Sequence, residues 1–108
     1  MGIFCRCKSL SNINPLEKWN VSNCRNFSYL FDECTSLSDI EPLAKWDVSK
    51  GEEFHNMFSR CKSLPYFWPI EDWNVNIKSD FRSIFLDCDI EKNIDAVGKL
   101  GWRYYGWK

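Results

Sequence analysis

An internal repeat of 27 residues constrains this chain more than any other feature. Three stretches of the sequence, "CKSLSNINPLEKWNV", "CTSLSDIEPLAKWDV" and "CKSLPYFWPIEDWNV", are near copies of one another. Self-similarity at such a period predicts a repeat architecture in which each unit buries its apolar side chains against its neighbours. The positions that recur in step form a structural ladder, represented by Cys7, Cys34, Cys61, Cys88, Trp19, Trp46 and Trp73.

Each unit combines two apolar patterns. Phe27, Leu30, Phe31 and Cys34 have the i, i+3, i+4, i+7 spacing of one face of a short helix, and the next two units repeat that spacing. The Leu-x-x-Ile-x-Pro segment that follows each cysteine is too short for a helix, and its proline prevents one from extending. We therefore expect this second segment to be a brief parallel strand.

A unit of one strand and one helix cannot bury its apolar side chains alone, so neighbouring units must stack. The pattern thus predicts an α/β solenoid with a 27-residue period. Short parallel strands would line one side of it and short helices the other.

The repeat resembles that of the BspA-like leucine-rich repeat surface proteins. The resemblance covers roughly residues 3–88 and rests on stretches such as "FDECTSLSDIEPLAKWDVSKGEEFHNMF". It implies short leucine-rich repeats in a surface or secreted protein that binds host or neighbouring proteins. The third unit departs from the pattern, because Phe67 stands where the first two units have isoleucine.

The length of 108 residues supports one domain with one core. We expect about three leucine-rich repeats in residues 1–88. A degenerate fourth repeat and a C-terminal cap would occupy residues 89–108, where the motif decays and the chain ends in "GWRYYGWK".

Composition argues against several classes of partner. Lysine and arginine number 14 and the acidic residues 15, so the chain lacks the basic excess typical of nucleic-acid binding. No apolar run approaches the roughly 20 residues that a membrane span needs. Without a glycine-rich phosphate loop, no cofactor is expected either. We therefore expect a protein partner, no nucleic acid and no membrane insertion.

The ladder cysteines are expected to be buried free thiols. Stacked helices lie about 8–10 Å apart, whereas a disulfide requires Cα atoms within about 7 Å. A metal site would need ligands that converge on one point, and a ladder spreads them along a line, so no metal is expected. Cys5 and Cys24 lie off the ladder and could be exposed thiols or a local bridge.

Catalysis is not expected, so the chain is predicted not to be an enzyme. The sequence has one histidine, His55, and no nucleophile is evidently placed within its hydrogen-bond reach. Asn20, Asp47 and Asn74 follow the tryptophans, and we expect their short polar side chains to hydrogen-bond backbone groups of the adjacent turn.

The candidate ligand-binding site lies where the repeats disagree. In the predicted sheet, the variable positions around Leu-x-x-Ile-x-Pro point outward. They include Asp39 and Glu41 in the second unit and Tyr66 and Trp68 in the third. Exposed aromatic rings beside carboxylates are typical of protein interfaces. The alternative is that Tyr66 and Trp68 lie beneath the C-terminal cap.

Two functions are therefore compatible with the sequence. The first is a non-enzymatic binding module that recognises a protein, or as a second choice a glycan, on the sheet face. The alternative is a structural spacer, or a self-assembling fragment of a longer repeat array, whose ends associate with further copies.

Overall fold

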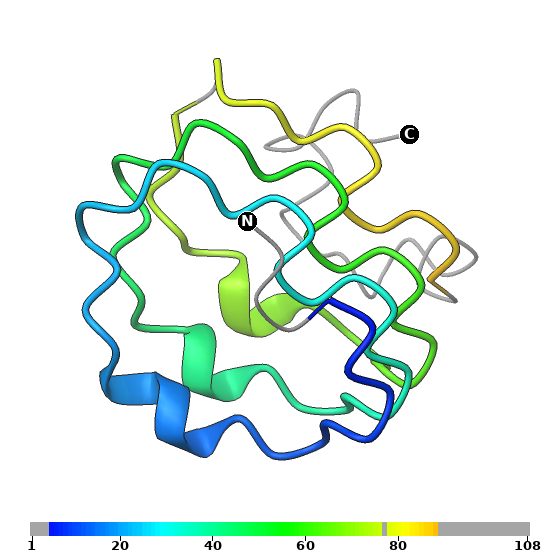
Figure 1. Ribbon diagram of the computed structural model, residues 1–108. Coiled ribbons are helices and arrows are strands. Elements are labelled where there is room, and N and C mark those ends of the chain that lie inside the picture. The colour runs from blue at the N-terminus through cyan, green and yellow to red at the C-terminus, as the bar shows by residue number, and fades with distance from the viewer. Residues whose placement is uncertain (1–4, 77, 89–108) are drawn as a thin grey trace.

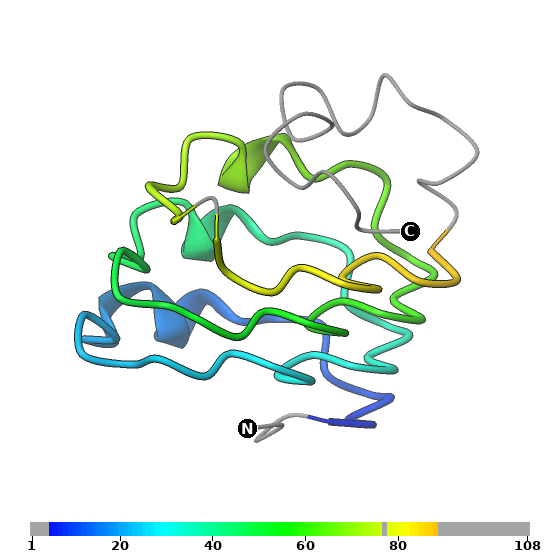
Figure 2. The same ribbon diagram turned by 90° about the horizontal axis from the view of Figure 1, so that it is seen from above.

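The computed structural model describes residues 5–76 and 78–88, and in it the chain winds through three coils that stack in parallel (Figures 1 and 2). We number them coil 1 (residues 8–34), coil 2 (35–61) and coil 3 (62–88). One side of the stack carries a short 3-10 helix from each coil, and the opposite side carries a run of turns that ends at the ladder cysteine.

The 3-10 helices are η1 (Asn14–Lys18), η2 (Glu41–Leu43) and η3 (Trp68–Ile70). In η1 and η2 a proline stands in the first turn, where its fixed φ is favourable and its missing N–H is not needed. The residue two before each helix fixes its entry, because Asn12 Oδ1 accepts the Asn14 N–H and Asp39 Oδ1 accepts the Glu41 N–H, both at 2.9 Å. Each expected strand is thus replaced by loop and 3-10 helix.

The segments expected to be helices, 27–34, 54–61 and 81–88, are chains of four-residue turns. In the first, the Leu30 N–H donates to the Phe27 carbonyl and the Cys34 N–H to the Phe31 carbonyl. The third residue of each turn has a positive φ between 56° and 61°, which a turn of this kind requires and a helix excludes. These residues are Tyr29, Glu33, Asn56, Arg60, Ser83 and Asp87.

Backbone hydrogen bonds between the coils explain why turns replace helices. Every second amide of segment 27–34 donates to coil 2: Phe27 to Glu53, Tyr29 to His55, Phe31 to Met57 and Glu33 to Ser59, over 2.7–3.1 Å. Segment 54–61 bonds to coil 3 in the same way. Those carbonyls accept hydrogen bonds from the backbone of a neighbouring coil. They therefore do not accept the hydrogen bonds within their own segment that a helix would need.

The prediction of an α/β leucine-rich-repeat solenoid is therefore wrong. The described residues contain no α-helix and no strand. Their only strand-like pairings are two isolated parallel bridges, Asn26 to Glu53 and Glu53 to Asp80. The leucine-rich-repeat fold that the BspA-like resemblance implied is wrong for the same reason. The 27-residue period is nevertheless present, because the two bridges join residues that are 27 positions apart. The predicted fourth repeat and cap, residues 89–108, lie outside the described residues.

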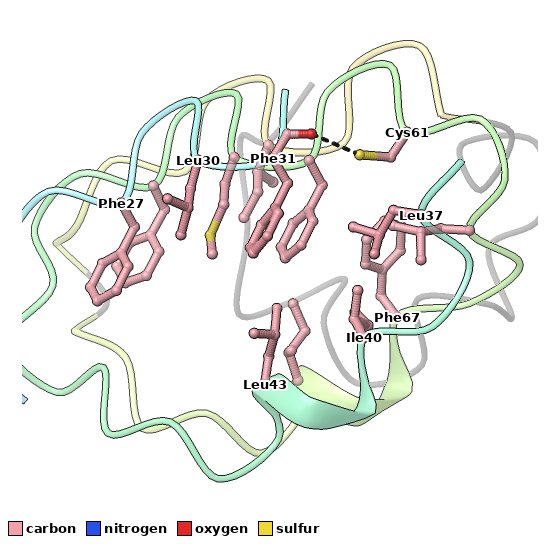
Figure 3. Close-up of a cluster of buried hydrophobic side chains, with 14 of the residues drawn as sticks. Phe27, Leu30, Phe31, Leu37, Ile40, Leu43, Cys61 and Phe67 are labelled. Carbon is pink, nitrogen blue, oxygen red and sulfur yellow. Dashed lines mark hydrogen bonds between the residues drawn. The ribbon is translucent and has the colours of Figure 1, made fainter. Parts of the chain in front are cut away.

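The core lies between the two sides of the stack. Phe27, Phe54 and Phe81 stack with ring centroids 5.1 and 5.0 Å apart, and a second column joins Phe31 to Phe58 at 5.7 Å. Figure 3 shows Phe27, Leu30 and Phe31 pointing from the turn side toward Ile40 and Leu43 on the 3-10 helix side. Apolar side chains from both sides thus fill a core that no unit could enclose alone.

Candidate functional site

An acidic groove on the 3-10 helix side is the candidate functional site. Its volume is about 480 Å³, and all three coils contribute to it. Pro42, Ala44 and Pro69 supply apolar surface, and the polar side chains are those of Asn14, Glu17, Asp39, Glu41, Glu71 and Asp72. The stacking of the coils therefore converts one short acidic segment per coil into a single continuous surface.

Like charges gather in this groove. Five of its lining residues carry carboxylates, and no lysine or arginine lines it among the residues that the structure describes. Glu17, Asp39, Glu41 and Asp72 are exposed, whereas Glu71 is half-buried. A hollow lined by charges of one sign focuses the local field and attracts ligands of the opposite sign. The groove is thus suited to a cationic ligand.

Two of the four predicted ligand-binding residues lie in this groove. Asp39 and Glu41 face it from the start of η2, although on no sheet. Tyr66 is half-buried and is not among the lining residues. Trp68 begins η3, and its side chain lies outside the described part of the structure. Of the predicted aromatic pair, Tyr66 is therefore not brought together with the carboxylates, and the predicted role of Trp68 stays a prediction.

Sequence reasoning missed three of the groove's carboxylates, those of Glu17, Glu71 and Asp72. Glu17 and Glu71 each stand two residues after the repeated proline, at positions 15 and 69. Extending the comparison of the repeats past the proline would have found them. The prediction stopped there because a strand cannot continue through that residue, whereas a 3-10 helix accepts it in its first turn.

The chain matches the family described as "Mycoplasma protein of unknown function, DUF285" over residues 1–97. It belongs to this family. No curated protein and no solved structure matches it significantly. The DUF285 match does not bear on the resemblance to BspA-like proteins, which stays a prediction. Within residues 5–76 and 78–88, no helix is long and apolar enough to cross a membrane.

The tryptophan ladder of this DUF285 chain ties each coil to the one before it. Trp46 and Trp73 are buried, and each indole N–H donates to a carbonyl 30 residues earlier at 2.8 Å, that of Leu16 and of Leu43. Trp19, the equivalent residue of coil 1, is instead 46% exposed. The ladder therefore holds the groove's three acidic segments in a fixed stack.

The cysteine ladder binds the turn side in the same manner. Cys34, Cys61 and Cys88 are buried, and Cys7 is half-buried. The Cys61 thiol donates to the Phe31 carbonyl at 3.1 Å and the Cys88 thiol to the Phe58 carbonyl at 2.9 Å. Burial raises the pKa of the Cys34 thiol to about 12. Burial raises the pKa of the Cys61 thiol as well, so Cys34 and Cys61 are poor nucleophiles that fill the core.

Asn20 and Asp47 shape the corner that follows each tryptophan. The Ser22 N–H and the Ser49 N–H donate to Asn20 Oδ1 and Asp47 Oδ1, each at 3.1 Å, so the backbone role expected for these two residues is confirmed. The Ser49 hydroxyl also donates to Asp47 at 2.6 Å, and both bonds hold the pKa of that carboxyl below its usual value.

Proposed function

We propose that this chain is a non-enzymatic binding module whose acidic groove binds a lysine- or arginine-rich segment of a partner protein. The observation that carries the proposal is the convergence of carboxylates from three coils on one hollow of about 480 Å³. The binding-module role expected from the sequence is kept, and its place moves from a sheet face to this groove.

The groove would select cationic side chains mainly by charge. An exposed ion pair contributes only about 0.2–1 kcal/mol, so affinity requires several pairs at once. Carboxylates on successive coils offer them in a row along the stack, as an extended segment with repeated basic side chains requires. The attraction would steer association and weaken with salt. A glycan is less well supported, because no aromatic ring lines the groove among the described residues.

Fluorescence anisotropy with a labelled octa-arginine peptide tests the proposal. The variant combines Glu17→Gln, Glu41→Gln and Glu71→Gln, which removes one carboxylate from each coil. The matched control combines Glu33→Gln, Glu52→Gln and Asp87→Asn, which changes the net charge equally outside the groove lining. Losing three pairs of about 0.5 kcal/mol each should weaken binding about tenfold in the groove variant. Equal losses in both variants would show attraction to net charge alone.

The spacer alternative has one observation in its favour, an apolar hollow on coil 1. It has a volume of about 100 Å³ and is lined by Trp19, Val21, Cys24, Asn26, Phe27, Leu30 and Trp46. A further coil, or a second copy of the chain, would bury this surface. Sedimentation velocity tests this alternative: concentration-dependent association that Trp19→Gln abolishes supports self-assembly, and a monomer at all concentrations contradicts it.

A further inference from the structure

On the turn side, away from the acidic groove, coils 2 and 3 bring together one imidazole and two carboxylates. His55 Nδ1 lies 3.2 Å from Glu53 Oε2 and 3.5 Å from Asp80 Oδ2. One ligand atom from each of the three residues lies within 4.8 Å of the others. We propose that Glu53, His55 and Asp80 form a binding site for a divalent transition-metal cation such as Zn²⁺, with Nδ1 and one oxygen of each carboxylate as ligands.

The repeat explains how these side chains meet. Residues 26, 53 and 80 are equivalent and are joined by the two parallel bridges, which stack Glu53 directly against Asp80. In coils 1 and 3 the backbone N–H two positions later donates to the side chain at this position. The Ser28 N–H donates to Asn26 Oδ1 at 2.9 Å, and the Arg82 N–H donates to Asp80 Oδ1 at 3.0 Å. Coil 2 has His55 there, and its Nδ1 is buried without a hydrogen-bond partner.

This missing hydrogen bond separates a metal site from a simple ion pair. At 3.2 Å, Glu53 Oε2 is close enough to accept a proton from Nδ1, so the bond fails through direction rather than distance. Two ligand atoms of one tetrahedral metal ion are likewise close together without pointing at each other. Zinc bonds of about 2.0–2.2 Å place neighbouring ligand atoms roughly 3.3–3.5 Å apart, with each oxygen roughly 35° off the line from nitrogen to metal.

The donor set indicates the class of cation. Imidazole favours zinc, copper, nickel and iron, whereas magnesium and calcium prefer sites made of oxygen alone. The two carboxylates would neutralise a dication. Arg82 holds Asp80 through Nε at 3.0 Å and Nη2 at 2.9 Å, which orients the carboxylate and leaves Oδ2 with a further lone pair.

The surroundings favour a site with three protein ligands and an open position. The His55 side chain is 28% exposed and that of Asp80 22%, so the cluster is partly shielded. The Tyr29 ring meets the imidazole edge-on with centroids 5.4 Å apart. Glu53 and Asp80 also line a cavity of about 280 Å³ with Ser79 and Asn76, which leaves room for water or a donor atom of a ligand.

Zinc titration followed by NMR of the imidazole nitrogens tests the proposal directly, because His55 is the only histidine in the chain. We expect saturation at one ion per chain, with the resonance of Nδ1 shifting more than that of Nε2. At a free Zn²⁺ concentration one-hundredfold above the dissociation constant, the melting temperature should rise by roughly 10 °C. Mg²⁺ at the same concentration should produce neither change.

Variants assign the ligands. Glu53→Gln and His55→Gln should each weaken zinc binding at least tenfold, whereas Asp87→Asn, at an exposed carboxylate outside both the cluster and its cavity, should leave it unchanged. Melting curves without metal show whether each variant is folded, and the imidazole spectrum of the unaltered chain needs no variant. A titration that leaves the imidazole resonances unchanged would overturn the proposal. Thiolate-to-metal absorption with Co²⁺ would do so too, because it would place the ion on the cysteines.

Discussion

At the scale of single residues, Asp32 stands out because it is the one charged side chain enclosed by the core among the described residues. Its carboxylate accepts hydrogen bonds from the Ser59 hydroxyl and, at 3.4 Å, from Arg60 Nη1, so coils 1 and 2 share it. A buried carboxylate is tolerated only when such partners satisfy it. Asp32 and Ser59 should therefore stabilise the fold as a pair rather than separately.

A double-mutant cycle measures this coupling. Asp32→Ala and Ser59→Ala should each lower the free energy of unfolding by about 1–3 kcal/mol, since each removes a hydrogen bond from a buried polar partner. The double variant should cost less than the sum, with a coupling of about 1 kcal/mol or more by urea denaturation. Asp72→Ala, at an exposed carboxylate, is the control and should cost clearly less. Additive losses would contradict the pairing.

Cys34 predicts a loss of stability in alkaline solution. Burial raises its pKa from 9.0 to about 12, so the unfolded chain releases this proton at a lower pH than the folded chain does. The contribution is therefore complete below pH 9 and is lost as the pH rises toward 12. In Cys34→Ala the decrease in melting temperature across this window should be shallower. Leu37→Ala, a core truncation without a titratable group, should keep the original slope; equal slopes in both would refute the assignment.

At the scale of elements, the turn segments decide the architecture. A chain of four-residue turns places residues such as Phe27, Leu30, Phe31 and Cys34 on one face, with the spacing that also marks a helix. The two structures differ in one testable respect, the positive φ of every fourth residue. In that conformation a residue other than glycine is strained, whereas in a helix glycine is the poorer residue.

Ser83→Gly distinguishes the two structures. Its φ is 56°, so glycine should relieve strain and raise the free energy of unfolding by up to about 1 kcal/mol. Ser83→Val should lower it, because a β-branched side chain tolerates this conformation poorly. Ser36→Gly, at an exposed residue without positive φ, should be neutral or destabilising. If Ser83→Gly were destabilising by about 0.5–1 kcal/mol, as in a helix interior, the segment would not be the turn observed here.

These segments also show how far the sequence could predict the fold. The register of the repeat predicted that equivalent side chains stack, as Phe27 and Phe54 do, because residues 27 positions apart occupy equivalent places in successive coils. The repeat could not predict the local backbone conformation. Helix and tandem turns bury the same positions, and the choice depends on hydrogen bonds between coils, such as that from Phe31 to Met57, which no local pattern encodes.

The candidate sites were predictable to a similar degree. Asp39 and Glu41 were found because they vary between the repeats, and they line the groove. Glu17 and Glu71 were missed because a strand was expected where a 3-10 helix carries the chain. The sequence predicted only that no nucleophile lies near His55, and it did not predict the contact to Asp80, because that contact joins two coils.

At the scale of the whole molecule, stability should depend on how well each coil is covered by the next. In the contacts described above, hydrogen bonds and ring stacking connect only neighbouring coils. The free energy of unfolding should therefore be roughly the sum of contributions from each coil and from each interface between neighbours. The tryptophans allow a matched comparison. Trp46 is 5% exposed, bonds to Leu16 of coil 1 and lies against Phe27, whereas Trp19 is 46% exposed.

Trp46→Ala should therefore lower the free energy of unfolding by roughly 3–5 kcal/mol, the usual cost of truncating a buried tryptophan. Trp19→Ala removes the same side chain one coil earlier and should cost less than half as much, because Trp19 is already 46% exposed to water. Urea denaturation of the two variants supplies the comparison. Trp46→Phe, which keeps a ring but loses the donor to the Leu16 carbonyl, should fall between the original chain and Trp46→Ala. Equal losses at Trp19 and Trp46 would mean that coverage by a neighbouring coil does not set the stability of the stack.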